Sequence, residues 1–394
     1  MRILFLSAEY PPETGWGGIG SYVKCIASGL VGRGHEVHVL SCAPAQQHRD
    51  YADRAVHVHR RRLFKVRGAY RVRLPLTLHR LAAGISTFTW ARRLGVSFDV
   101  VEYPEWNGEG WLFALLRRTP TVAHLHTPLS VMIRHCGDAT TMDIQLASYI
   151  ERFSVLRADN VTSPSNLLAD EVAAEGWNVE EGIRVVPYPV DWQTWAEIPP
   201  ASQAPPVVQF VGRIEPRKAP EVLVHAMTIL RHEIPEAAAR FAGKYLPDSS
   251  GVFPAMPWSD EKNFEGCSFV GQMPRVELGA SLTACRVVAQ PSLFENFSLA
   301  ALESMAAGRA VVVTSTAGIA PFVTNNRCGE VVPPRDAAAL AQALKPYLSD
   351  PQYAAQTGGR ARDAVRRELT PGRIAALREK VYASAVDSFR EPTQ

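Results

Sequence analysis

One pattern occurs twice in the chain, and this repeat limits the possible folds of the chain more than any other feature does. A buried strand from Ile3 to Ser7 runs into a Pro- and Gly-rich loop and then a helix at about 21–32. A second buried strand, in the sequence PVVQFVG, runs into a loop with Gly212 and a helix opened by Pro220. Two repeats of strand, glycine-bearing loop and helix predict an α/β protein with two Rossmann-like domains.

The segment 192–206 is rich in Pro, Ala and Gln and is interpreted as a linker. It divides the 394 residues into a first domain at 1–191 and a second at 207–373. With 46% hydrophobic and 21% charged residues, the chain has the composition of a soluble globular enzyme. Six cysteines without a Cys-x-x-Cys pair, and no signal peptide or long apolar span, predict reduced thiols, a cytoplasmic location and at most peripheral contact with a membrane.

The stretch from Ala289 to Gly318 predicts a strand, a loop, a helix and a further strand. Ser298 is predicted to cap the helix and Gly308 to end it. Glu295 then lies in the loop and Glu303 about two turns into the helix. Both are near the carboxyl ends of parallel strands, where open α/β sheets bind ligands. A capped surface helix with a solvated Glu303 is the simpler interpretation, and spacing alone does not separate the two.

Carboxylates beside the amino end of a helix fit a ligand with an anionic middle and hydroxyl-bearing ends. Helix amides and cations hold phosphate groups, while carboxylates accept hydrogen bonds from hydroxyls. The loop GRIEPRKAPEVLV supplies two cations, because Arg213 and Lys218 can converge on one diphosphate beside a helix amino end. Exposed loop cations without a ligand are the alternative. A nucleotide-sugar has this division of charge.

Gly15, Gly17 and Gly20 satisfy the G-x-G-x-x-G pattern of dinucleotide-binding proteins. These glycines lie eight or more residues past the first strand, and the second strand runs into Ser41 and Cys42, where a ribose-binding acid would be expected. We therefore favour a long loop that closes over a substrate, with a plain surface turn as the alternative.

The segment from Arg54 to Phe98 contains no Asp or Glu but carries eleven cations: Arg54, Arg60, Arg61, Arg62, Lys65, Arg67, Arg71, Arg73, Arg80, Arg92 and Arg93. A solvated positive face is the default interpretation of such a run. The functional alternatives are peripheral association with an anionic membrane or capture of a phosphorylated acceptor. Nucleic acid is not an expected partner, because aromatic residues are sparse and no binding module is present.

His124 and His126 alternate along a predicted strand, so they share one face. His135 and Cys136 follow nearby, but no tight grouping completes a metal site, and none is predicted. A hydrogen-bonded core histidine is the expected state of His124. His126 ends the strand, just before Thr127, and is the better candidate for a ligand site.

Three of these stretches resemble the retaining family-4 glycosyltransferases. Glu295 and Glu303 within PSLFENFSLAALESMAAG resemble the family signature, GRIEPRKAPEVLV resembles its diphosphate loop, and HTP from His126 resembles its acceptor-side motif. The resemblance runs from Arg2 to about Leu348. It implies the GT-B fold, in which two Rossmann-like β/α/β domains face each other across a cleft. It also implies that the last helix, at about 374–394, packs back onto the first domain.

The resemblance also implies roles for individual residues. Donor binding is implied for Gly17, Gly18, Gly212, Arg213, Lys218, Val270, Gly271, Met273, Glu295, Asn296, Phe297, Ser298, Leu299 and Glu303. Acceptor binding is implied for Gly18, His126 and Thr127, and catalytic roles for Arg213, Lys218, Glu295 and His126. Within this set, residues 270–273 lie against the base, Glu303 holds the ribose and Glu295 the donor sugar. Many members have glycines at the positions of Asn296 and Ser298, so the identity of the sugar stays open.

The implied reaction moves a sugar from a UDP- or GDP-linked donor to a hydroxyl of a small-molecule, lipid-linked or glycan acceptor, with the α-linkage retained. In this front-face mechanism the leaving phosphate takes the proton of the acceptor. No metal or other cofactor is required, because Arg213 and Lys218 neutralise the phosphates. Two competitors remain: a GT-B nucleotide-sugar epimerase, which needs no acceptor, and a non-enzymatic binder of membranes or nucleic acid that uses the basic segment.

Overall fold

A computed structural model describes the chain except for residues 15–16, 44–47, 65–71, 138, 246–264 and 391–394. The chain forms two compact units. The first unit comprises Met1–Pro189 and Pro371–Gln394, and the second comprises Val190–Thr370. The carboxyl-terminal segment therefore returns to the first unit, as the resemblance implies.

The first unit is built on a sheet with the strand order β3-β4-β2-β1-β5-β6-β7-β8, in which every pairing is parallel except β3 with β4. The strands are β1 (Arg2–Leu6), β2 (Glu36–Cys42), β3 (Arg49–Asp53), β4 (Val56–Arg61), β5 (Val100–Pro104), β6 (Thr121–His124), β7 (Asn160–Ser163) and β8 (Ile183–Val185). Parallel neighbours bury both faces of the central strands, and Ile3, Leu4 and Phe5 of β1 are accordingly buried.

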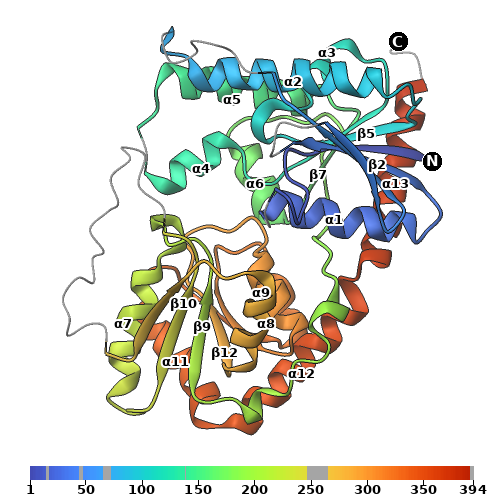
Figure 1. Ribbon diagram of the computed structural model, residues 1–394. Coiled ribbons are helices and arrows are strands. Elements are labelled where there is room, and N and C mark those ends of the chain that lie inside the picture. The colour runs from blue at the N-terminus through green and yellow to red at the C-terminus, as the bar shows by residue number, and fades with distance from the viewer. Residues whose placement is uncertain (15–16, 44–47, 65–71, 138, 246–264, 391–394) are drawn as a thin grey trace. The chain divides into compact units, whose positions relative to one another are not determined.

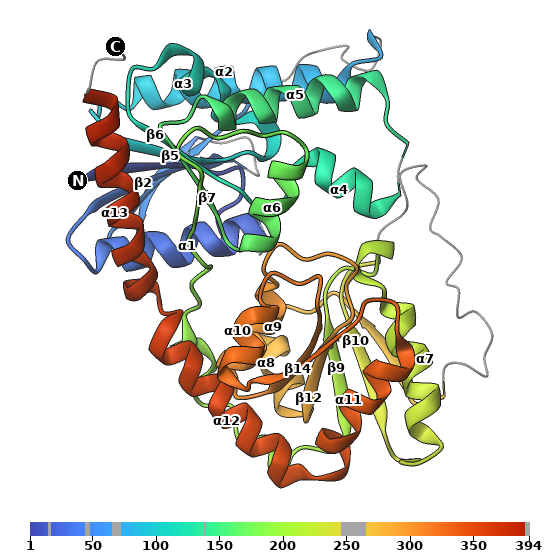
Figure 2. The ribbon, with the colours of Figure 1, turned by 180° about the vertical axis from the view of Figure 1, so that it is seen from behind.

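Helices cover both faces of this sheet. They are α1 (Gly18–Val31), α2 (Pro75–Arg93), α3 (Trp111–Leu116), α4 (Leu129–Cys136), α5 (Met142–Leu156), α6 (Asn166–Ala174) and α13 (Pro371–Arg390). Helices α2, α3 and α5 pack together on one face, and α1 packs beside α13 on the other (Figure 1 and Figure 2). A Cβ at Gly29 would lie 2.4 Å from the carbonyl oxygen of Pro371, so the start of α13 approaches α1 at a position that only glycine allows.

A buried ionic cluster joins α13 to the first sheet. Arg378 of α13 donates from Nη1 to Thr162 Oγ1 at 2.7 Å, and the same nitrogen is 3.4 Å from Glu102 Oε2. Glu102 also accepts hydrogen bonds from the hydroxyls of Tyr22, at 2.7 Å, and Tyr382, at 2.6 Å. The helix is therefore fixed by charge as well as by apolar packing.

The second unit is built on a fully parallel sheet with the order β11-β10-β9-β12-β13-β14. Its strands are β9 (Val207–Val211), β10 (Ala238–Ala242), β11 (Cys267–Gly271), β12 (Val287–Gln290), β13 (Ala310–Thr314) and β14 (Gly329–Val332). Its helices are α7 (Pro220–Arg231), α8 (Arg275–Thr283), α9 (Leu299–Ala306), α10 (Ala320–Asn326), α11 (Ala337–Ser349) and α12 (Pro351–Glu368). Helices α7 and α11 pack together on one side of the sheet, and α12 packs against α9 and α10 (Figure 1 and Figure 2).

Two expectations about this unit differ from the structure. Residues 192–206 are part of the second unit and contain two 3₁₀-helices, η3 (Trp192–Trp195) and η4 (Ala201–Gln203). They pack there because Trp195 and Ala201 are buried, so this segment is not a free linker. No clear secondary structure is predicted from the sequence for residues 241–258; of these, 241 and 242 end β10, while 246–264 lie outside the described residues.

Candidate active site

The predicted strand, loop, helix and strand between Ala289 and Gly318 are confirmed as β12, α9 and β13. The side chain of Ser298 accepts a hydrogen bond from Ala301 N at 3.4 Å, as expected for an N-cap. Gly308 follows the helix with φ of 72°, in the left-handed region that glycine adopts without strain. Ser298 itself has φ of 75°, which explains why a glycine would also suit that position.

Glu295 lies in the loop before α9, where it is buried and surrounded by cations. It forms an ion pair with Lys218, its Oε2 is 3.7 Å from Arg217 Nη1, and its Oε1 accepts from Ser292 Oγ at 3.3 Å. Burial alone would raise the pKa of Glu295, but Lys218 and Arg217 hold it below its ordinary value. Burial also lowers the pKa of Lys218, and Glu295 opposes that change. Lys218, which is predicted to bind the phosphates, and Glu295, which is predicted to bind the donor sugar, are therefore paired with each other.

Arg217 is a residue of this site that the sequence did not reveal. It lies in the 3₁₀-helix η5 (Pro216–Lys218), where its Nη1 donates to the carbonyl oxygen of Phe294 at 2.8 Å and its Nη2 to Glu215 at 2.7 Å. Arg213, which was predicted, has a half-exposed side chain 3.2 Å from the same Glu215 carboxylate. Glu215 therefore bridges the two arginines. Only the path of the loop shows which of its cations turns inward.

Glu303 lies on α9 and is paired with a different cation. Its Oε1 is 2.7 Å from Arg275 Nη1, at the start of α8. Burial raises the pKa of Glu303 above its ordinary value, and Arg275 opposes part of that rise. The guanidinium of Arg275 lies 4.9 Å from the ring centroid of Trp195. Glu303 is therefore not the solvated surface residue of the simpler interpretation, and neither Arg275 nor Trp195 was singled out from the sequence.

The remaining donor-site residues predicted in the second unit lie around the loop that precedes α9, on the edge strand β11 and in the loop after β9. Val270 is exposed at the end of β11, and Gly271 follows with φ of 74°. Met273 and Leu299 are half-buried. The ring of Phe297 is buried, and its amide donates to the side-chain oxygen of Asn296 at 2.8 Å. Gly212 lies beside the side chain of Lys218, since a Cβ at this glycine would be 3.9 Å from Lys218 Cε.

His126 is the centre of an aromatic cluster in the first unit. Its Nδ1 is 2.5 Å from the hydroxyl of Tyr188, and its ring lies 5.3 Å from that of Tyr22. Burial, with a contribution from Arg378, lowers the pKa of His126 to about 3, so the imidazole is neutral at neutral pH. His124 is buried and bonded through Nδ1 to Thr162 at 2.9 Å, while its Nε2 has no hydrogen-bond partner among the described residues.

Glu105 fixes the backbone that follows His126. Its carboxylate accepts from the amides of His126, at 2.9 Å, and Thr127, at 2.6 Å. These amides precede α4, so a buried carboxylate lies at the amino end of that helix. Glu105 is another residue that the sequence did not reveal.

The predicted glycine loop ends in α1, whose first residue is Gly18 and whose N-cap is Gly17. A Cβ at Gly17 would lie 2.0 Å from Glu9 Oε2, and the amide of Gly20 donates to the same oxygen at 3.4 Å. The carboxylate of Glu9 therefore lies at the helix end where the resemblance implies binding of the donor and the acceptor.

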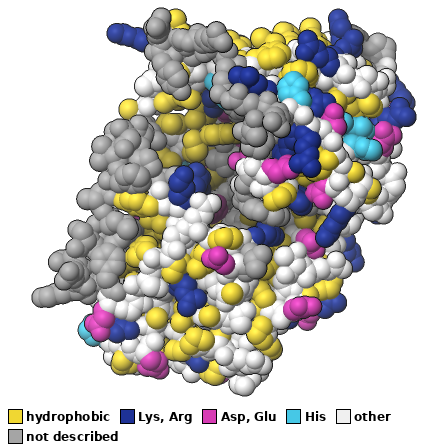
Figure 3. Space-filling model, in the orientation of Figure 1, with side chains coloured by type: hydrophobic (Ala, Val, Ile, Leu, Met, Phe, Trp, Pro, Cys, Tyr) yellow, Lys and Arg dark blue, Asp and Glu magenta, His cyan; other side chains and the backbone are white. Residues whose placement is uncertain are grey.

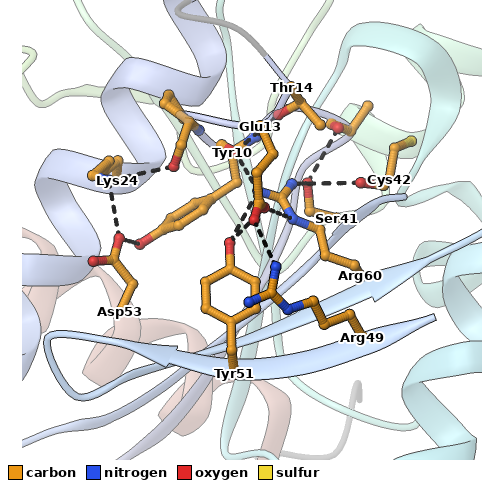
Figure 4. Close-up of polar contacts among 12 residues, drawn as sticks. Tyr10, Glu13, Thr14, Lys24, Ser41, Cys42, Arg49, Tyr51, Asp53 and Arg60 are labelled. Atoms are coloured by element: carbon orange, nitrogen blue, oxygen red, sulfur yellow. Dashed lines mark hydrogen bonds and ion pairs between the residues drawn. The ribbon is translucent and has the colours of Figure 1, made fainter. Parts of the chain in front are cut away.

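The basic segment does not form a single solvated face. Arg60 is buried, and it pairs with Glu13, donates to Ser41 at 2.9 Å and contacts Tyr51 at 3.1 Å (Figure 4). In that view Glu13 lies between Arg49, Tyr51 and Arg60. Arg60 is therefore not exposed for contact with a lipid or an anionic acceptor, because a carboxylate from outside the segment approaches it and its side chain is buried.

Other cations of the segment differ in their surroundings. Arg80 is buried 2.7 Å from Glu151, and Arg61 is 2.8 Å from Asp50. Arg54, Arg62, Arg73, Arg92 and Arg93 are exposed, whereas Lys65, Arg67 and Arg71 lie outside the described residues. In Figure 3, Lys and Arg side chains at the upper right alternate with acidic side chains and histidines. The remaining positive surface is therefore smaller than the sequence indicated.

In the part of the chain that the structure describes, no group of three His, Cys, Asp or Glu side chains could hold a metal ion. Within the same residues, no helix is both long enough and apolar enough to cross a membrane.

Two families of known proteins match the chain, and their matches meet close to the boundary between the two units. Residues 16–193 match the family described as Glycosyltransferase Family 4, and residues 192–364 match Glycosyl transferases group 1. A D-inositol 3-phosphate glycosyltransferase of Kineococcus radiotolerans is 30% identical over 378 residues, covering 89% of this chain and 87% of that protein. A glycogen synthase of Mycobacterium tuberculosis is 25% identical over 413 residues, covering 100% of this chain and 97% of that protein.

The fold is shared with solved structures. The crystal structure of Anabaena Alr3699/HepE in complex with UDP-glucose has a TM-score of 0.69 at 18% identity, over 98% of this chain and 100% of that one. Two Rossmann-like units and these matches define a glycosyltransferase of the GT-B type. The chain belongs to glycosyltransferase family 4.

Proposed function

We propose that the protein is a retaining glycosyltransferase that moves a sugar from a UDP- or GDP-linked donor to an acceptor hydroxyl and keeps the α-linkage. The observation that carries this proposal is the pair of cation-bound carboxylates around α9, the buried Glu295 with Lys218 and the half-buried Glu303 with Arg275. Such a site offers anionic acceptors to hydroxyls and cations to phosphates within one unit. The relatives support this division, since one structure holds UDP-glucose and two relatives are named for glycogen and D-inositol 3-phosphate.

In the proposed reaction, the diphosphate leaving group is stabilised by Lys218, Arg213 and the amides at the start of α9. Fixed positive charge at a developing anion is usually the largest contribution to catalysis. Glu303 accepts hydrogen bonds from the ribose and Glu295 from the donor sugar. The leaving phosphate takes the proton of the acceptor hydroxyl, so this chain supplies no nucleophile, and the proposal includes no metal ion.

The acceptor side of the proposal rests on the first unit. His126 is neutral and its Nδ1 is engaged with Tyr188, so we assign it to orienting the acceptor with Thr127 and Gly18. The acceptor is a small polyol, a lipid-linked sugar or a glycan. Peripheral binding to an anionic membrane belongs to the same proposal and is tested below.

The test is a screen of UDP-, GDP- and ADP-sugars with and without inositol phosphate or malto-oligosaccharide. We expect one donor to release its nucleoside diphosphate only when an acceptor is present, and the product to have the α configuration by NMR. Conversion of the donor to an epimer without any acceptor would instead identify an epimerase. Tight nucleotide binding with no turnover on any acceptor would contradict the proposal and favour a binding protein.

A further inference from the structure

Arg275 connects two parts of the second unit that are 108 residues apart in the chain, Trp195 of η3 and Glu303 of α9. Its Nη1 is 2.7 Å from Glu303 Oε1, and its guanidinium lies 4.9 Å from the centroid of the Trp195 ring. The indole is almost fully buried, whereas the side chains of Arg275 and Glu303 keep 20% and 14% of their exposure. The buried indole of Trp195 therefore supports the guanidinium of Arg275, while Arg275 and Glu303 remain partly accessible.

This arrangement determines what Glu303 can accept. A carboxylate has about four lone-pair positions on its two oxygens. Arg275 Nη1 is 2.7 Å from one of the Glu303 oxygens, and even a guanidinium that contacts both oxygens leaves positions for two neighbouring hydroxyls. A carboxylate that loses its cation in a buried site tends to take up a proton, and it then loses acceptor capacity. The direction in which the oxygens point is also set by the guanidinium, whose own position is set by Trp195.

We propose that Arg275, seated on Trp195, is a positioning residue that holds Glu303 as an oriented anion for the ribose hydroxyls of the donor. The inference rests on the proposed function, because Glu303 is the ribose ligand there. Segment 192–206, which the sequence indicated as a linker, then contributes Trp195 to the donor site. Arg275 acts through Glu303 and does not touch the reacting atoms.

The test compares UDP with 2′,3′-dideoxy-UDP, and GDP with its dideoxy analogue, by calorimetry on the full chain. Arg275→Met should weaken UDP or GDP binding about tenfold to a hundredfold, the range of one charge-assisted hydrogen bond. It should leave the dideoxy analogue within about twofold of wild type, because that ligand has no hydroxyls for Glu303 to hold. Arg275→Lys keeps the charge and should recover part of the loss.

A double variant separates positioning from general damage. Arg275→Met combined with Glu303→Gln should bind UDP or GDP no more weakly than Glu303→Gln alone, since the two residues act as one. The matched control is Arg367→Met, which removes an exposed arginine 2.6 Å from Glu368 on α12 of the same unit and should change neither ligand's affinity. Unfolding midpoints of all variants check the fold.

Three results would overturn the inference: equal losses for UDP or GDP and its dideoxy analogue, no loss for either, or additive losses in the double variant. Equal losses would place Arg275 on the diphosphate or base. Failure of the wild-type protein to bind both UDP and GDP is a different result, because it contradicts the proposed function itself and this inference with it.

Discussion

Lys218 and Glu295 form a part-buried ion pair, although they are 77 positions apart in the sequence. Arg217 supports the pair from the other carboxylate oxygen, at 3.7 Å. In the proposed reaction, a diphosphate becomes a second anion beside Lys218, and Arg217 remains to neutralise Glu295. The pair therefore links the part of the site assigned to phosphate with the part assigned to sugar.

Substitution of the two cations that are proposed to bind the phosphates should reduce turnover. Lys218→Ala and Arg213→Ala should each lower kcat by about a hundredfold to a thousandfold, because each removes a fixed positive charge from a developing anion. Initial-rate kinetics with the donor found in the screen measure the effect. The control is Lys345→Ala, an exposed lysine paired with Glu233, which should retain full activity. Unchanged kcat in both site variants would remove these residues from the mechanism.

The two carboxylates should differ in the ligands that they affect. Glu303→Gln should weaken binding of the nucleoside diphosphate itself, whereas Glu295→Gln should weaken only the sugar-bearing donor. Each loss should be about 1.5–3 kcal/mol, the contribution of a hydrogen bond to a charged group. Calorimetry with the diphosphate and with the intact donor measures both. If the two variants weaken the diphosphate equally, the assignment of separate roles is incorrect.

Three exposed arginines near Trp90 are the best remaining candidates for binding an anionic surface. The carbonyl oxygen of Arg62 accepts from Trp90 Nε1 at 3.0 Å, Arg93 lies 4.8 Å from the indole centroid, and Arg92 is adjacent. Reversal of all three to Glu should abolish sedimentation with anionic vesicles or raise KM for a phosphorylated acceptor, since each cation near such a surface contributes about 1 kcal/mol.

The charge-matched control for this experiment reverses Arg327, Arg335 and Lys345, which are exposed on the second unit. It should leave vesicle binding and the acceptor KM unchanged. The wild-type interaction should also weaken as added salt shortens the screening length below about 10 Å. If neither quantity responds to charge reversal or to salt, these arginines form a solvated face only.

Loss of Arg378 should destabilise the first unit. Arg378→Met leaves Glu102 buried with two tyrosine hydroxyls and without its cation partner, and breaking such a pair costs about 3–5 kcal/mol. Urea denaturation followed by circular dichroism measures the change. Lys380→Met, which alters an exposed cation two residues along α13, should cost less than about 0.5 kcal/mol. Similar stability of the two variants would show that the buried pair contributes little.

Stability should fall as pH rises because of two buried carboxyl groups in the first unit. Burial, with the carboxylate of Glu151, raises the pKa of Glu105 from 4.5 to about 8, and burial raises that of Glu109 to about 7. The folded protein therefore holds these protons more tightly than the unfolded chain. Their stabilising contribution is complete below pH 4.5 and is lost as pH rises through 7 and 8, by up to about 1.4 kcal/mol per pH unit for each group.

Urea denaturation between pH 5 and 8 tests this dependence. Glu105→Gln should flatten the fall over the whole range, and Glu109→Gln should flatten it mainly below pH 7. Wild-type stability that rises between pH 5 and 8, with no change in slope in either variant, would contradict the assignment.

The sequence determined the features that depend on neighbouring residues. Strand and helix periodicity gave β1, β9, β12 and β13, and the capping role of Ser298 and the helix end at Gly308 follow from residues within one turn. The placement of Glu295 in a loop and Glu303 on a helix has the same local origin, as does the recognition of family 4. These features depend on contacts between residues that are close in the sequence, so the sequence pattern is sufficient to predict them.

Only the tertiary structure decided which charges meet. In the second unit, Lys218 pairs with Glu295, and Arg275 contacts both Trp195 and Glu303. In the acid-free segment, Arg60 pairs with Glu13 and Arg80 with Glu151, and both carboxylates come from outside the segment. A run of cations without acids predicts a solvated face only if no distant carboxylate approaches it. That approach depends on the path of the whole chain, because a buried charge is stable only where folding brings it an opposite one.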